Sequence, residues 1–250
     1  MDYLAHLFLL SARHSAVLSL VPVFNLRAMP VVVRLALAVL LSAAVLPPGS
    51  QPVPSVPTDQ GFFLILVKEM LVGGLVGFGV ALVLAAFQAA GDLVGLQLGL
   101  SLSGLIDPMG GTGESMMDSF YNLLAGLVFF ASNAHHAVLA GLWQLSIAVP
   151  VGQWDLQPGT EQVFLSLAGT LFVVALRVAL PVIAVMLVAD VALAVLSRLA
   201  PQMQTFFVGL PAKLGLGLLV LLLTLPALVS EMVGTFDAAT DRILVLFRGT

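Results

Sequence analysis

Long runs without a charged residue constrain this chain more than any other feature. Residues 70–91 contain 22 positions without a formal charge, and residues 119–149 contain 31. Charged residues make up only 9% of the whole chain, compared with about 25% in a typical soluble domain. So few charges cannot cover the surface of a soluble globule. The sequence therefore predicts an all-α protein that lies in a membrane, or in a complex that buries it like a membrane.

Prolines and charges interrupt these apolar runs. Arg13 lies in the middle of the first run, and Arg177 and Asp190 flank Pro181. An arginine at the centre of a spanning helix costs about 2.5–3.5 kcal/mol on insertion scales, so Arg13 should face protein or water, or snorkel from a tilted helix. The pattern fits kinked helical hairpins that bury most of their surface against other subunits. The candidate buried charges are Arg13, Arg34, Arg177 and Asp190.

Arg177 and Asp190 permit two interpretations. Ionisable residues at membrane depth are functional candidates and are usually paired. They form either a structural ion pair between neighbouring elements or part of an ion-conducting or transport site. Pro181 lies between them and predicts a hairpin or a kinked helix.

Other segments have a recognisable local character. Residues 47–60 hold five prolines and predict an extended linker. Polar residues 132–136 divide the second long run, which is too long for one span. Gly73 and Gly77 form a small-xxx-small pair that lets helix backbones approach closely. Residues 230–250 mix charges with apolar positions, which fits an amphipathic helix at an interface.

The centre of the chain holds a glycine-rich stretch between apolar segments. Pro108 disfavours the helical region for Asp107, and three glycines lie within residues 110–113, so a helix cannot continue there. Glycines permit movement, and methionines supply soft side chains for a hydrophobic constriction, although methionines also fill ordinary cores. We interpret the stretch as the moving part of a pore. The candidate gate residues are Ile106, Asp107, Pro108, Met109, Gly110, Gly111, Thr112, Gly113, Glu114, Met116 and Met117.

The sequence lacks the residues that several classes of function require. The chain has no cysteine, which excludes disulfides and thiolate metal sites. His135 and His136 point about 100° apart on a helix with no third ligand nearby, so a polar turn is favoured over a metal site. No basic block suited to nucleic acid is present, and neither HExxH nor GxSxG occurs. We expect no enzymatic activity, no cofactor, and no removable signal peptide, because Arg13 and His14 interrupt the first apolar stretch.

A series of short patches follows in order from about residue 10 to about residue 230. The patches are Pro22-Val23-Phe24, Pro30 to Ala38, Glu69 with Gly73 and Gly77, Ala90-Gly91-Asp92, Gln97-Leu98-Gly99, Asp107-Pro108, Asn133-Ala134-His135-His136, Gln144-Leu145-Ser146 before Pro150, Ala179-Leu180-Pro181-Val182, Asp190, Ala200-Pro201-Gln202-Met203-Gln204 and Gly209-Leu210-Pro211-Ala212-Lys213. Each patch is weak alone, but the ordered series is specific. It resembles the FliR family of flagellar biosynthesis proteins, whose virulence counterparts are the SctT export-apparatus proteins. The Asn133 turn is closer to the flagellar branch, although Ala134 replaces the glycine usual there.

The resemblance implies a subunit of the core export gate of a type III secretion system, in the bacterial inner membrane at the flagellar basal body. One copy would complete a helical hetero-oligomer with FliP-like and FliQ-like subunits, beside FlhB-like and FlhA-like proteins, around a channel for unfolded exported proteins. Residues 1–160 would form a FliP-like part, and residues 161–250 a FliQ-like hairpin with the C-terminal tail. Residues 106–117 would be the plug that occludes the closed channel.

Two alternatives to this function stay open. One is a virulence-type export subunit. The other is a small-molecule or ion transporter with discontinuous helices, in which Arg177, Pro181 and Asp190 form the midplane site. The transporter reading predicts inverted repeats, and the sequence shows no convincing internal repeat.

Overall fold

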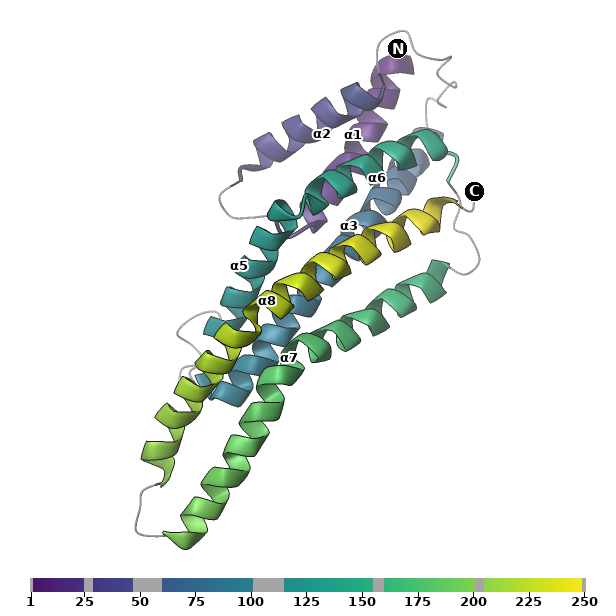
Figure 1. Cartoon of the computed structure of the whole chain (residues 1–250). Coiled ribbons are helices and arrows are strands. Elements are labelled where there is room, and N and C mark those ends of the chain that lie inside the picture. The colour runs from purple at the N-terminus through teal and green to yellow at the C-terminus, as the bar shows by residue number, and fades with distance from the viewer. Residues whose placement is uncertain are drawn as a thin grey trace. The chain divides into compact units, whose positions relative to one another are not determined.

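The computed structural model of the chain describes residues 2–24, 29–46, 60–100, 115–154, 160–200 and 205–248. No strand lies within these ranges, and the elements are α-helices (Figure 1). They are α1 (Asp2–Leu20), α2 (Val31–Val45), α3 (Gln60–Leu98), α5 (Met116–Ala131), α6 (Ala134–Ala148), α7 (Thr160–Leu199) and α8 (Thr205–Arg248). The expected all-α class is confirmed. The predicted linker at residues 47–60 lies outside the described residues except for its last position.

Three of these helices are long and apolar enough to cross a membrane. The apolar stretches are Gly61–Leu98 in α3, Leu165–Leu199 in α7 and Gly209–Ala239 in α8. α5 and α6 together make a possible fourth span, broken by a bend of 65°. α1 and α2 are not among these spans, because α2 is too short and α1 is less apolar.

The break predicted within residues 132–136 is confirmed. α5 ends at Ala131 and α6 begins at Ala134. Between them Asn133 has a φ of 60°, a left-handed conformation that asparagine adopts more readily than most residues. The backbone N–H of Ser132 donates to Val128 O at 2.8 Å, and that of His136 donates to Asn133 O at 2.9 Å. The chain therefore bends here with these backbone groups still paired.

Two helices are longer than the proline positions suggest. Of the hairpin and the kinked helix that Pro181 allows, the hairpin is wrong, because α7 is one helix with Pro181 inside it. α8 includes Pro211 and Pro226 and continues to Arg248. The amphipathic tail from residue 230 onward is therefore the end of a longer helix. A proline removes one backbone hydrogen bond, whereas a full break in apolar surroundings would leave more groups unpaired.

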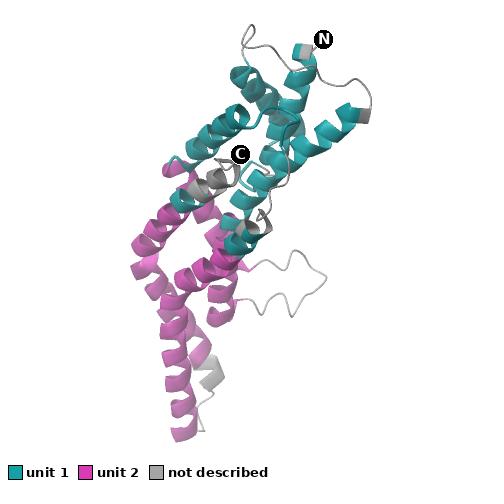
Figure 2. Cartoon of the chain, turned by 90° about the vertical axis from the view of Figure 1, so that its right-hand side faces the viewer, with its two compact units in different colours: residues 1–83, 133–168, 236–250 teal, residues 84–132, 169–235 magenta. Residues whose placement is uncertain are grey.

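The described chain divides into two compact units, each built from separate stretches of sequence (Figure 2). Unit 1 comprises residues 1–83, 133–168 and 236–250, and unit 2 comprises residues 84–132 and 169–235. α3, α7 and α8 each run from one unit into the other. The expected division near residue 160 concerns likeness to FliP-like and FliQ-like proteins, and it stays a prediction.

Each unit has its own apolar core. In unit 1, Leu9, Val17 and Val72 are fully buried, and in unit 2 Phe87 and Tyr121 are fully buried. Large apolar side chains on α7 and α8 are also exposed in the isolated chain. Examples are Phe172, Val188, Leu222 and Leu223.

Candidate functional site

Two glycines of α3 bring this helix into backbone contact with α1 in unit 1. A Cβ atom on Gly73 would collide with the backbone carbonyl of Arg13, and one on Gly77 would lie 3.0 Å from the Cα and O atoms of Val17. Gly73 and Gly77 are four residues apart and therefore share one helix face. The contact has the geometry of a small-xxx-small helix pair, in which side chains would force the backbones apart.

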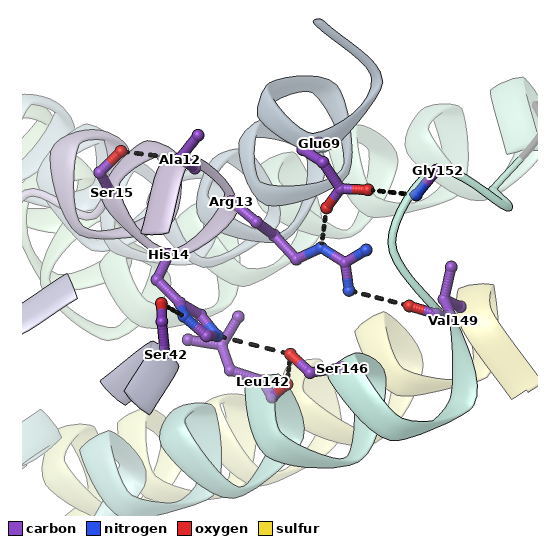
Figure 3. A network of polar contacts seen from close by, with 10 residues as sticks. All are labelled: Ala12, Arg13, His14, Ser15, Ser42, Glu69, Leu142, Ser146, Val149 and Gly152. Carbon is purple, nitrogen blue, oxygen red and sulfur yellow. Dashed lines mark hydrogen bonds and ion pairs between the residues drawn. The ribbon is translucent and has the colours of Figure 1, made fainter. Parts of the chain in front are cut away.

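Arg13 lies at this contact and is completely buried. Its Nε atom donates a hydrogen bond to Glu69 Oε2 at 2.5 Å, and its Nη1 atom donates to the backbone carbonyl of Val149 at 3.1 Å (Figure 3). The other carboxylate oxygen of Glu69 accepts from the backbone N–H of Gly152 at 2.9 Å. One ion pair thus ties α1 and α3 to the turn that follows α6.

Glu69 is the functional candidate that sequence reasoning missed. It is buried to the same degree as Arg13 and supplies its counter-charge, although the two residues are 56 positions apart. A signal was present, because Glu69 and Gly73 are spaced by four residues and lie on the face of α3 that meets α1. Arg13 thus faces protein and does not snorkel. Its Nη2 atom has no hydrogen-bond partner in the structure.

His14 continues the polar network from Arg13 toward α2 and α6. Its Nδ1 atom lies 2.7 Å from the hydroxyl of Ser42, and its Nε2 atom lies 3.4 Å from the hydroxyl of Ser146. The Ser42 hydroxyl donates to the Ala38 carbonyl at 2.7 Å and the Ser146 hydroxyl donates to the Leu142 carbonyl at 2.8 Å, so either hydroxyl oxygen can accept from the one ring nitrogen that carries the proton. Burial, and secondarily the Arg13 charge, lower the pKa of His14 to about 4. His14 is therefore neutral at neutral pH and links three helices through hydroxyl groups.

An apolar hollow of about 310 Å³ adjoins this network. His14 forms part of its wall, together with residues of α2 and α6 that include the half-exposed Trp143.

A second close helix contact occurs in unit 2, between α3 and the first turn of α5. A Cβ atom on Gly91 would lie 2.7 Å from Met117 O and 2.9 Å from the Cα atom of Asp118. Gln88, one turn earlier on α3, donates its side-chain N–H to Asp118 Oδ2 at 3.3 Å. Ser115 caps α5, since its hydroxyl accepts from the backbone N–H of Met117 at 3.3 Å. The Ser115 cap therefore fixes the first turn of α5, and Gln88 ties that turn to α3.

Arg177 and Asp190 of α7 are each paired with a residue of α8 and not with each other. Arg177 Nη1 lies 2.8 Å from Glu231 Oε1, and Lys213 Nζ lies 2.6 Å from Asp190 Oδ1. The Arg177 and Asp190 side chains are 62% and 44% exposed in the isolated chain, so their burial against partner subunits stays a prediction. The structure does not bring Arg177 and Asp190 together around Pro181 as a transport site requires.

The remaining candidate residues have separate positions. Arg34 is half-buried at the start of α2, with Nη2 3.4 Å from Met29 O. Met116 and Met117 are the first two residues of α5, and the other gate candidates, residues 106–114, lie outside the described residues. His135 and His136 contact each other edge to face. In the part of the chain that the structure describes, no group of three His, Asp or Glu residues is placed to hold a metal ion.

Sequence comparison extends the similarity over nearly the whole chain. Residues 4–239 match the family described as bacterial export proteins, family 1. The chain belongs to this family. It is 35% identical to the flagellar biosynthetic protein FliR of Pectobacterium carotovorum subsp. carotovorum over 231 residues, which cover 90% of this chain and 86% of the relative. It is 29% identical to FliR of Bacillus subtilis (strain 168) over 243 residues, which cover 96% and 93%.

The family also has a differently named relative of this chain. The surface presentation of antigens protein SpaR of Shigella sonnei is 33% identical over 183 residues, covering 72% of this chain and 70% of that protein. The resemblance to the FliR family is therefore confirmed. Two of the sequence patches that carry the resemblance, Glu69 with Gly73 and Ala90 to Asp92, lie at the two close helix contacts of this bacterial export protein.

Proposed function

We propose that this chain is a subunit of the export gate of a bacterial type III secretion system of the flagellar kind. It joins as a single copy with FliP-like and FliQ-like subunits, beside FlhB-like and FlhA-like proteins, in the inner membrane at the flagellar base. Together these subunits enclose a channel for unfolded exported proteins. The observation that carries this proposal is the match to the bacterial export family over residues 4–239.

Alignments that span nine-tenths or more of the chain are to FliR proteins, among them those below, and they favour the flagellar branch. The FliR proteins of Pectobacterium carotovorum and Bacillus subtilis align with 90% and 96% of the chain. SpaR of Shigella sonnei aligns with 72%. A virulence-type system is therefore the second candidate, and the phenotype of a deletion strain distinguishes the two.

The surfaces of α7 and α8 support a place inside a larger assembly. Their most apolar windows are only 33% and 22% buried within the chain, compared with 56% for α3. The same two helices carry accessible ion pairs, Arg177 with Glu231 and Asp190 with Lys213, and charges are costly in hydrocarbon. Partner subunits meet both needs, because they cover apolar surface and offer polar groups to the ion pairs.

Residues 106–117 are the proposed plug of the channel. Gly110, Gly111 and Gly113 allow the backbone to rearrange, and Met109 supplies a flexible apolar side chain. A ring of apolar side chains excludes water and ions from a narrow pore, yet it yields to an unfolded polypeptide. The plug therefore has the composition of a seal that opens for a passing chain and closes behind it.

Deleting the gene from its host tests the proposed machine. We expect loss of swimming and of flagellar protein export, with both restored by a plasmid copy. A tagged copy should co-purify with FliP-like and FliQ-like subunits at a fixed ratio. A deletion strain that swims normally, or a chain purified alone that transports a small solute into liposomes, would contradict the proposal. Loss of virulence-protein secretion with normal swimming would assign the other branch.

Ion leakage tests the plug separately. Cells carrying a deletion of residues 110–113 should leak ions while the complex still assembles, and wild-type cells should not. Membrane potential dyes measure the leak, and co-purification measures assembly. An assembled complex without a leak would show that these residues do not seal the channel.

A further inference from the structure

We propose that Gly91 and Gln88 of α3 form a fixed seat for the start of α5, and that Met117 belongs to this seat and not to the moving plug. The inference rests on the proposed function, since the seat matters as the anchor at the C-terminal end of the plug. It reassigns one candidate gate residue and identifies two positioning residues outside the loop.

At the seat, the backbones of α3 and α5 approach each other closely. Gly91 admits α5 so closely that a Cβ atom there would lie 2.7 Å from Met117 O, 2.9 Å from Asp118 Cα and 3.0 Å from Tyr121 Cβ. Two of these three atoms belong to the backbone, so a side-chain rotation cannot relieve the collision. Only glycine at position 91 allows α5 to begin at this point on α3.

Polar contacts then fix the orientation of the first turn. Ser115 accepts from the backbone N–H of Met117 and caps the helix, and Gln88 donates to the carboxylate of Asp118 at 3.3 Å. Asp118 is 3% exposed and lies in the first helical turn, where the helix dipole favours its negative charge. The chain entering α5 is therefore held from two sides, by its own cap and by α3.

The two methionines at this junction differ in their surroundings. Met117 is 7% exposed, whereas Met116 is 71% exposed. The backbone of Met117 lies at the close contact with Gly91, and its side chain is buried. Met117 therefore belongs to the fixed start of α5, whereas Met116 stays a candidate gate residue.

Thiol labelling of the assembled complex in membranes tests the seat directly, because the chain contains no cysteine. Met117→Cys should react with a maleimide at least about tenfold more slowly than the same variant after denaturation in detergent, since reaction requires local opening. In the Gly91→Ala background the labelling of Met117→Cys should become faster. Equal rates in the native and denatured samples would overturn the proposal without depending on any Gly91 variant.

Ion leakage links the seat to the plug. Gly91→Ala should cause a leak in an assembled complex, whereas Gly126→Ala on α5, where a Cβ atom would meet nothing within 4 Å, should not. A leak from the deletion of residues 110–113 without one from assembled Gly91→Ala would overturn the seat and leave the proposed function standing. If neither the deletion of residues 110–113 nor Gly91→Ala causes a leak, the proposed plug is contradicted. The labelling of Met117→Cys then still decides whether the seat exists.

Discussion

Arg13 illustrates, at the scale of single residues, how a charge is accommodated in an apolar protein. Its guanidinium group is buried with one carboxylate and one backbone carbonyl as partners. The Coulomb attraction within a buried ion pair is largely offset by the cost of desolvating both charges, so the pair contributes little net stability, whereas one partner left alone is strongly destabilising. The main effect of Glu69 is therefore to make a buried Arg13 tolerable.

Removing one partner of this pair should be worse than removing both. We expect Glu69→Leu to lower the free energy of unfolding by about 3–5 kcal/mol. The double variant Arg13→Leu with Glu69→Leu should lose less than Glu69→Leu alone, because no charge is then left buried. Thermal or denaturant unfolding of the detergent-solubilised complex compares four proteins, namely the wild type, Glu69→Leu, Arg13→Leu and the double variant. Strictly additive losses would show that Arg13 and Glu69 are not coupled.

His14 should make unit 1 sensitive to acid. Its pKa is about 4 in the folded chain, below the value of about 6.5 for an unperturbed histidine. The unfolded chain therefore binds the proton more tightly, and stability is constant above about pH 6.5, falls as the pH drops, and levels off below about pH 4. The full loss is about 3 kcal/mol for a shift of this size.

The matched variant for this measurement is His14→Asn, whose amide N–H can donate to Ser42 but does not titrate. Unfolding followed between pH 7 and about pH 4 should show a shallower slope for this variant than for the wild type. The same slope in both proteins would mean that another group carries the acid sensitivity.

At the scale of elements, the glycines of α3 decide which helices touch. Gly73 and Gly77 admit α1, and Gly91 admits α5 in the other unit. The same helix also carries Gly74, where a Cβ atom would have its nearest neighbour at 3.8 Å. The distinction between these two kinds of glycine depends on which face of α3 each one occupies.

Neighbouring glycines of α3 should therefore respond differently to the same substitution. Gly73→Ala places a Cβ atom against the Arg13 carbonyl and should destabilise unit 1 by about 1–3 kcal/mol. Gly74→Ala has its nearest atom, Leu20 Cδ1, at 3.8 Å and should be neutral or stabilising by up to about 1 kcal/mol, because alanine favours a helix. Unfolding midpoints compare the two variants. Equal effects would contradict a close α1–α3 contact.

At the scale of the whole molecule, α7 and α8 are incomplete by themselves. Two ion pairs join them, but much of their apolar surface stays exposed in the isolated chain. Exposed ion pairs contribute little in water because solvent screens them. They matter more once a neighbouring subunit excludes that water.

Reversing one charge should consequently impair assembly more than folding. We expect Arg177→Glu to lower recovery of the export complex about fivefold, the effect of about 1 kcal/mol. Adding Glu231→Arg should restore recovery, since the pair is then re-formed with opposite polarity. Asp237→Lys, at another exposed position of α8, serves as the control. Failure of the double variant to recover would mean that Arg177 contacts a partner rather than Glu231.

The sequence by itself determined the class of the protein, its family and most of its helices. The apolar runs became α3, α5, α6, α7 and α8, and residues 132–136 became the bend between α5 and α6. These features depend on neighbours in the sequence, because periodicity, hydropathy and turn chemistry act within a few residues. Arg13 was recognised as a charge in need of protein or water for the same reason.

Only the tertiary structure decided which distant residues meet. Glu69 pairs with Arg13, Glu231 with Arg177, and Gly91 seats the start of α5. Each contact depends on the rotation and register of two helices, which the pattern of one segment does not specify. A shift of one residue along an α-helix turns a side chain by about 100°, so a pairing between helices is fixed only once their faces have packed.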